Sequence, residues 1–202
     1  MKKILFSFSL LLFGLMINGC VKNSTVTQNQ QTTIQRTTVP TPISPTIVTA
    51  PPLAMGDYDQ LQTVQGTTLS LQEKSNGFVF PQYNNKIVLL QIFGQDCPYC
   101  FEEMPIINNI KRKYAGNLQL IGIQAQEPMS KETASYLIQK FEMNYPIIDK
   151  DEGRGLLRFI QNTYGWTGIL PYTLIIKNGV TEYSFSGAVS HQELDEAIKS
   201  LI

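Results

Sequence analysis

Continuous apolar runs alternate with apolar residues at helical spacing over most of the chain after residue 66. Uninterrupted runs predict buried strands, and apolar residues that recur every three or four positions predict amphipathic helices. The expected strands are residues 87–93, 118–123, 145–148, 172–176 and 181–185, with weaker strands between 67 and 80. The expected helices are residues 98–114, 130–141, 155–164 and 190–202. Strands that alternate with helices predict an α/β layer structure.

Short polar and proline signals mark where these elements begin, bend and turn. Ser130 is suited to cap the second helix, and Ser190 with Glu193 forms a capping-box pattern at the start of the last one. Pro105 removes a backbone donor inside the first helix and predicts a kink there. Residues 178–179 read Asn-Gly, which is typical of a tight β-hairpin turn. The last two strands should therefore be antiparallel neighbours.

The first nineteen residues have the layout of a secretory signal peptide. Two lysines follow Met1, and residues 4–17 are apolar apart from serines and a glycine. This stretch is shorter than a typical membrane span of about 20 residues. The junction at residues 17–20 resembles a bacterial lipobox, which implies lipid attachment at Cys20 and a membrane tether outside the cytoplasm. An ordinary signal peptide with an incidental cysteine is the alternative, and it predicts the same disulfide-permissive compartment.

A linker and one folded domain are expected after the signal. Residues 21–52 are rich in Thr, Gln and Pro and contain no aromatic residue, so they offer too little apolar surface to offset the entropy of folding. We therefore expect a signal peptide at 1–19, the lipidated cysteine and linker at 20–56, and a folded domain at 57–202. All sixteen acidic residues lie in that domain, but the whole chain has balanced formal charge. Nothing in the charge indicates nucleic-acid binding.

Cys97-Pro98-Tyr99-Cys100 is the motif that carries chemistry. The chain has three cysteines, and this pair lies between a predicted buried strand and a predicted helix. Unpaired N–H groups and the dipole at a helix N-terminus favour a thiolate, which is the nucleophile of disulfide exchange. Two thiols and the single histidine, His191, fall short of the four ligands of a structural zinc site, so we expect no metal and no cofactor. A passive disulfide is the alternative, although so short a loop stabilises a fold little.

The order of elements together with this motif resembles the thioredoxin fold, in particular its membrane-tethered TlpA-like or ResA-like branch. The resemblance covers residues 67–202. The matching positions are the two cysteines, Glu103 and Pro105 in a Glu-x-Pro run, residues 164–168, Pro171, and residues 178–179. It implies a central mixed β-sheet flanked by helices. It also implies that Pro171 is cis, lies opposite the cysteine pair and leaves backbone open to a substrate strand; an ordinary turn proline is the alternative.

Three positions depart from the family pattern. Asp96 replaces the tryptophan that commonly precedes the first cysteine, and a carboxylate close to Cys97 would oppose its thiolate. Gln91 stands where thioredoxins carry a buried acid. One extra residue before Pro171 leaves Leu170 as the residue packed beside the disulfide.

The motif and the resemblance together assign roles to the site residues. Cys97 is expected to attack the substrate disulfide, and Cys100 is expected to resolve the mixed disulfide. Glu103 can fall on the same helical face as Cys100 and exchange protons with the pair, unless it is a solvated residue beside Glu102. The residues expected to border the substrate are Pro98, Tyr99, Trp166 and Leu170.

These expectations amount to a membrane-tethered thiol–disulfide oxidoreductase. Its partners would be protein thiols and disulfides, together with a membrane thiol electron donor or acceptor. The resemblance favours a reductant of extracytoplasmic proteins. It also implies that the substrates include apocytochrome c, whose Cys-x-x-Cys-His segment is reduced before haem is attached. An oxidant or isomerase that forms disulfides in secreted proteins is one alternative, because thioredoxin-like pairs act in both directions. A non-catalytic tethered binding domain is another.

Overall fold

The computed structural model describes residues 58–202, the part of the chain that carries the strand and helix patterns. The predicted signal peptide, Cys20 and the linker lie outside the described residues, so they stay predictions. Within residues 58–202, no helix is both long enough and apolar enough to span a membrane.

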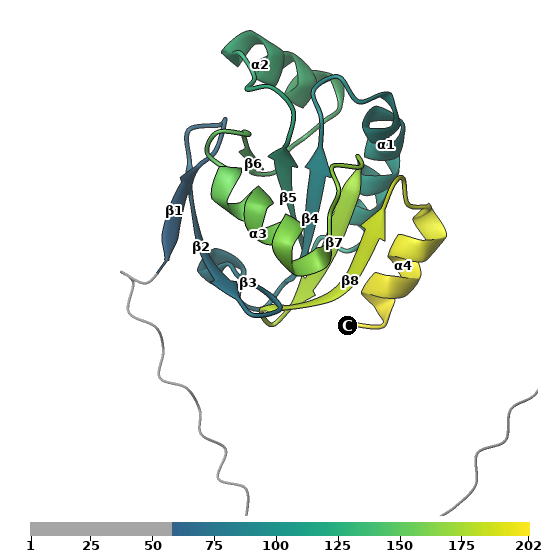
Figure 1. Cartoon of the computed structure of the whole chain (residues 1–202). Coiled ribbons are helices and arrows are strands. Elements are labelled where there is room, and N and C mark those ends of the chain that lie inside the picture. The colour runs from purple at the N-terminus through teal and green to yellow at the C-terminus, as the bar shows by residue number, and fades with distance from the viewer. Residues whose placement is uncertain (1–57) are drawn as a thin grey trace, which may run out of the picture. The chain divides into compact units, whose positions relative to one another are not determined.

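A five-stranded mixed sheet forms the centre of the fold, with strand order β6–β5–β4–β7–β8 (Figure 1). Strand β4 (Ile87–Phe93) is the middle strand, and every one of its residues is buried, as its continuous apolar run predicts. Strand β5 (Leu118–Gln124) pairs parallel to β4, and the short β6 (Ile147–Ile148) pairs parallel to β5. Strand β7 (Tyr172–Lys177) pairs antiparallel to β4, and β8 (Val180–Ser186) closes a hairpin with β7.

Helices cover both faces of this sheet (Figure 1). On one face, α1 (Pro98–Lys113), α2 (Lys131–Lys140) and α4 (His191–Lys199) contribute apolar side chains to a cluster with alternate residues of β4. On the other face, α3 (Arg154–Tyr164) packs against the intervening residues of β4. Burial of an apolar stripe on each side makes a three-layer α/β structure, as the alternating pattern predicts.

A second, three-stranded antiparallel sheet lies on the α3 side. It consists of β1 (Asp59–Gln62), β2 (Thr68–Lys74) and β3 (Gly77–Val79), followed by the short 3-10 helix η2 (Pro81–Tyr83). Its buried apolar residues Leu69, Leu71 and Phe78 join the cluster under α3, and so does Phe80, which follows β3. The weak strands expected between 67 and 80 are confirmed. Strand β1 was not predicted, because its polar sequence shows no apolar alternation and it forms by pairing with β2.

Two element boundaries differ from the sequence prediction by more than one residue. Strand β6 starts at Ile147 rather than at residue 145, because Pro146 has no N–H to give to a ladder and contributes only its carbonyl, which accepts from Gly122 N–H at 2.9 Å. Helix α4 ends at Lys199 rather than at residue 202. The capping box of Ser190 and Glu193 is present at its start, and Ser130 caps α2, as predicted.

A polar cluster around Asp195 fastens α4 to α1. The Asp195 carboxylate, nearly buried, accepts from the Lys113 ammonium, from the Tyr114 hydroxyl at 2.6 Å and from Lys199 at 2.7 Å. The Lys113 ammonium and then the Lys199 ammonium hold the pKa of Asp195 well below its usual range. The cluster therefore fixes α4, and with it the loop that precedes α4, against the helix that carries the cysteine pair.

Gly77 allows β3 to contact the β7–β8 turn closely. A Cβ atom at position 77 would lie 2.1 Å from the carbonyl oxygen of Gly179 and 2.9 Å from the Cα of Val180. We expect Gly77→Ala to lower the free energy of unfolding by about 1–3 kcal/mol, because backbone has to move to relieve the overlap. Gly116→Ala is the matched control, since a Cβ there meets nothing within 4 Å. Denaturant titration of both variants measures the difference, and equal losses would contradict this account.

Candidate active site

Cys97 and Cys100 lie at the junction of β4 and α1. Cys97 has extended backbone and is the N-cap of α1, where its sulfur accepts from the N–H of Cys100 at 3.2 Å. The two cysteines form a disulfide with their Cα atoms 5.3 Å apart. Cys97 is 6% exposed and Cys100 is 0% exposed. Cys97 is therefore the cysteine nearer solvent, at a helix end that favours a thiolate.

Glu103 is buried one helical turn after Cys100, with 1% of its surface exposed. Its Oε2 accepts from Gln91 Nε2 at 2.7 Å, and its Oε1 accepts from the N–H of Val189 at 2.8 Å. The alternative of a solvated surface carboxylate is therefore wrong. The Glu103 side chain therefore projects from α1 to a position between β4 and the loop before α4.

The surroundings of Glu103 favour its protonated form. Burial raises the pKa of Glu103, and the hydrogen bonds from Val189 and Gln91 lower it in part. Tyr145 packs close by and donates its hydroxyl to the sulfur of Met104 at 3.4 Å. Burial, and then the negative charge of Glu103, raise the pKa of Tyr145, so this phenol stays neutral. A buried carboxyl with a raised pKa is suited to exchange a proton with a neighbouring group near neutral pH.

Two further polar residues lie beside Glu103 on the same face of the sheet. Gln91 of β4 stands directly opposite Thr173 of β7 in the antiparallel register, and both are fully buried. From the sequence, Gln91 stood out only as a departure from the thioredoxin pattern, and Thr173 and the Val189 N–H were not predicted as part of the site. The available signal for Gln91 and Thr173 was a polar residue inside a continuous apolar strand. A backbone donor such as Val189 leaves no signal in the sequence.

The loop before β7 carries the proline that the resemblance singles out. The Leu170–Pro171 peptide is cis, as the resemblance implies. Leu170 is half-buried and packs against the apolar cluster that contains both cysteines. Trp166 packs on Tyr172 and donates its indole N–H to the carbonyl of Ile169 at 2.8 Å. Trp166 packs against the cluster on the α3 face. The loop before β7 therefore contributes side chains to the apolar clusters on both faces of the sheet.

Two of the four predicted substrate-bordering residues are open to solvent. Tyr99, between the two cysteines, is 65% exposed, and Pro98 is exposed beside it. Ile169, two residues before Pro171, is also exposed and was not predicted. Asp96 is exposed and its backbone N–H donates to Gln126 Oε1 at 2.8 Å. Asp96, Pro98 and Tyr99 adjoin the buried cysteines in sequence, and contact of Pro98 and Tyr99 with a substrate stays a prediction.

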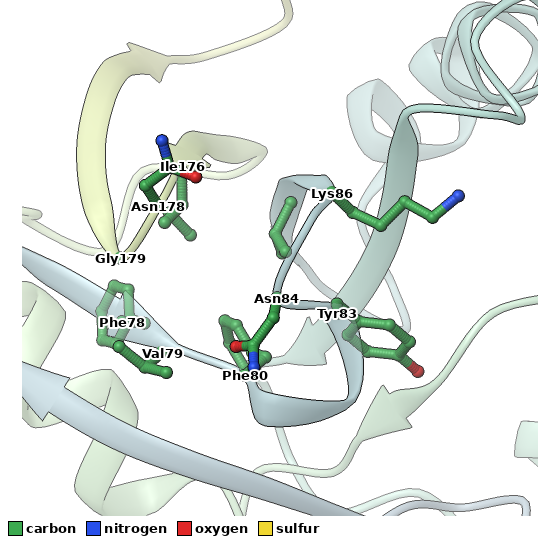
Figure 2. A pocket seen from close by; sticks show the side chains of 10 residues that line it. Phe78, Val79, Phe80, Tyr83, Asn84, Lys86, Ile176, Asn178 and Gly179 are labelled. Carbon is green, nitrogen blue, oxygen red and sulfur yellow. The ribbon is translucent and has the colours of Figure 1, made fainter. Parts of the chain in front are cut away.

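A pocket of about 230 Å³ is lined by residues of β3, η2 and the β7–β8 turn (Figure 2). Phe78, Phe80 and Tyr83 line it together with Lys86 and Val88 at the start of β4. The cysteine pair follows the other end of β4, and seven residues of strand span roughly 20 Å. The pocket therefore takes no part in the cysteine site. Among the described residues, no group of three or more His, Cys, Asp or Glu side chains is placed to hold a metal ion.

Comparison with known proteins gives sequence relatives of one kind. The chain is 26% identical over 121 residues to the thiol-disulfide oxidoreductase ResA of Geobacillus thermodenitrificans, a match that covers 59% of this chain and 65% of that protein. It is 24% identical over 120 residues to ResA of Bacillus thuringiensis, with the same coverage. The chain thus spans just under two thirds of the length of the curated relatives it matches. No protein-family model matches the chain.

Solved structures with the same fold come from several bacteria. A thiol:disulfide interchange protein of the thioredoxin family from Chlorobium tepidum has a TM-score of 0.58 at 19% identity, covering 72% of this chain and 93% of that one. A secreted Mycobacterium tuberculosis disulfide oxidoreductase homologous to DsbE has a TM-score of 0.51 at 16% identity, covering 71% and 96%. The predicted thioredoxin fold is confirmed. The sequence matches are to proteins named ResA, in line with the resemblance to the TlpA-like or ResA-like branch.

Proposed function

We propose that the chain is a thiol–disulfide oxidoreductase that reduces disulfides of extracytoplasmic proteins through Cys97 and Cys100. The observation that carries the proposal is a disulfide-linked pair at the N-terminus of α1, with the buried Glu103 one turn further along the same helix. The names of the ResA relatives support the reaction type. A lipid at Cys20 would tether the domain to the outer side of a membrane, where a membrane thiol partner would renew the dithiol.

The proposed reaction starts from the reduced pair. The Cys97 thiolate attacks one sulfur of the substrate disulfide, which forms a mixed disulfide and releases one substrate thiolate. Cys100 then gives its proton to the Glu103 carboxylate, and its thiolate attacks the sulfur of Cys97. The Cys97–substrate bond breaks, the second substrate thiolate leaves, and the Cys97–Cys100 disulfide seen in the structure remains. Two electrons pass to the substrate, and its two thiolates take up protons.

The charges around the pair support the reducing direction. Strong oxidants of this fold class owe their potential to a stabilised reduced form. Here the charged residues next to the pair in sequence are acidic: Asp96 before it, and Glu102 and Glu103 after it. Negative charge disfavours a thiolate, so it destabilises the reduced pair and makes the dithiol a better electron donor.

The reduction potential of the pair tests this proposal. We expect a value near or below about −250 mV, which lets the dithiol reduce most substrate disulfides. The full chain, held in detergent, is equilibrated against dithiothreitol and glutathione buffers, and the oxidised fraction is read by alkylation of free thiols. The double variant of Cys97→Ser with Cys100→Ser gives the background from Cys20.

A value near about −130 mV would overturn the reducing direction and make the protein a disulfide donor. Catalysed reduction of insulin by dithiothreitol separates both enzyme activities from a non-catalytic binding domain, which would give no acceleration. Reduction of a peptide with the Cys-x-x-Cys-His segment of an apocytochrome c tests the substrate class that the resemblance implies.

A further inference from the structure

The turn at residues 94–97 carries the chain from the end of β4 to the N-cap of α1. Its own hydrogen bond, from the Cys97 N–H to the Gly94 carbonyl, is 3.3 Å long, which exceeds the usual range for such bonds. The Asp96 N–H is bound from outside the turn, by the side-chain oxygen of Gln126 at 2.8 Å. A residue thirty positions later in the chain thus supplies the shorter of these two restraints.

The Gln126 amide also lies directly against the backbone of Gly94. A Cβ atom at position 94 would lie 2.4 Å from Gln126 Cδ and 2.5 Å from Gln126 Oε1, closer than non-bonded atoms approach each other. The amide therefore occupies space that only a glycine leaves free. The three heavy atoms nearest to such a Cβ all belong to the Gln126 side chain, so a larger residue at position 94 would displace the amide rather than the backbone.

Buried polar groups hold the loop that carries Gln126. Gln124, the last residue of β5, is fully buried. Its Oε1 accepts from the Gln126 N–H, and its Nε2 donates to the Glu127 carbonyl and, at 3.2 Å, to Asp149 Oδ1. Asp149 follows β6, and its Oδ2 accepts from the Met129 N–H at 3.0 Å. These bonds join the carboxyl ends of β5 and β6, and they hold Gln126 against the turn at the end of β4.

We propose that Gln126 is a positioning residue for Cys97. In the oxidised chain the disulfide itself ties Cys97 to Cys100 of α1. Reduction removes this link, and the bond from Asp96 to Gln126 then keeps the turn in place. The reduced Cys97 sulfur therefore stays at the N-cap, where the N–H groups of α1 favour a thiolate. The inference rests on the proposed function, which makes Cys97 the attacking thiolate.

The charged and titratable groups around the cysteine pair stay the same in the test of this role. They lie on the turn, on α1, in the loops after β5 and β6, before β6, and at the starts of α2 and α4; they are Asp96, Tyr99, Cys100, Glu102, Glu103, Glu127, Lys131, Glu132, Tyr145, Asp149, Lys150 and His191. Residues 165–171 before β7 and 187–190 before α4 are uncharged. Replacing Gln126 by another uncharged side chain therefore changes a contact and no charge.

The test is the pH dependence of Cys97 alkylation in the reduced full chain in detergent. Iodoacetamide reacts with the thiolate, and peptide mass spectrometry reads the product at Cys97 itself. We expect Gln126→Met, which keeps the length of the side chain but lacks the amide oxygen, to raise the midpoint by about one pH unit. The rate near neutral pH then falls about tenfold, within the range that a helix N-terminus contributes to a charged group. The plateau rate at high pH should not change.

Gly94→Ala tests the same contact from its other side. Gly94 has no positive φ, so alanine is compatible with its backbone. The added methyl group displaces the Gln126 amide and should raise the midpoint as Gln126→Met does. In a Gln126→Ala chain that space is already empty, so Gly94→Ala should have no further effect there. Gln119→Met is the matched control, because it makes the same chemical change at the other end of β5 and should keep the wild-type midpoint.

An unchanged midpoint in Gln126→Met would overturn the positioning role. A change confined to the plateau rate would overturn it too, because it would report access to the sulfur and not stabilisation of the thiolate. Additive effects of Gly94→Ala and Gln126→Ala would contradict the contact between them. Alkylation needs no substrate disulfide, so a chain that shows the midpoint shift but fails to exchange disulfides would contradict the proposed function, and not the positioning of Cys97.

Discussion

Cys97→Ser should abolish catalysed disulfide exchange, whereas Cys100→Ser should trap mixed disulfides with substrates. Cys97 is the more exposed cysteine and lies at the N-cap of α1, where a thiolate is favoured, while Cys100 is fully buried behind it. Without Cys97 the rate should fall to the uncatalysed rate. Without Cys100 the first attack still occurs, but no thiol resolves the mixed disulfide. Non-reducing electrophoresis and mass spectrometry of cell extracts detect the trapped species.

The double variant is the control for this trapping. With both cysteines of the pair replaced, the remaining Cys20 should form no substrate adducts, so any adduct in the Cys100→Ser chain comes from Cys97. Adducts that accumulate in Cys97→Ser instead would reverse the two roles. Because serine is close in size to cysteine, circular dichroism should show the same fold in all three chains.

Local signals in the sequence account for the elements that position the pair. The apolar run of β4 and the helical spacing of α1 lie next to each other, so the place of Cys97 at a helix N-terminus follows from residues a few positions away. The caps at Ser130 and Ser190 and the turn at residues 178–179 are local in the same sense. Each depends on backbone groups within about four residues, which sequence patterns describe well.

The acid–base part of the site depends on contacts between distant residues. Glu103 meets Gln91 twelve positions earlier and Val189 eighty-six positions later. The helical pattern of α1 placed Glu103 near Cys100, but it could not say whether the carboxylate is solvated. Its burial follows from the sheet and the α4 loop closing over it. The pairing of Gln91 with Thr173 requires the register of β4 and β7, which neither strand contains alone.

Glu103→Gln should slow disulfide exchange by about 10²-fold at neutral pH, the low end of general acid–base contributions. The same change should remove a pH-dependent loss of stability. Burial raises the pKa of Glu103 above its ordinary value of 4.5, so the folded chain binds this proton more tightly than the unfolded chain. The stability that this proton adds is complete below the unfolded pKa and is lost as pH rises through the folded pKa. An uncharged glutamine removes that titration.

Glu102→Gln is the matched control, because Glu102 is exposed and precedes Glu103 on the same helix. Chemical denaturation of the oxidised chains between about pH 4 and 8 measures the slope of stability against pH. Wild type and Glu102→Gln should lose stability together as pH rises, relative to Glu103→Gln, and only Glu103→Gln should be slow. A slope that survives in Glu103→Gln would assign the titration to another group. A slow but equally pH-dependent Glu103→Gln would show that the carboxyl acts through its hydrogen bonds to Gln91 and Val189, and not through its proton.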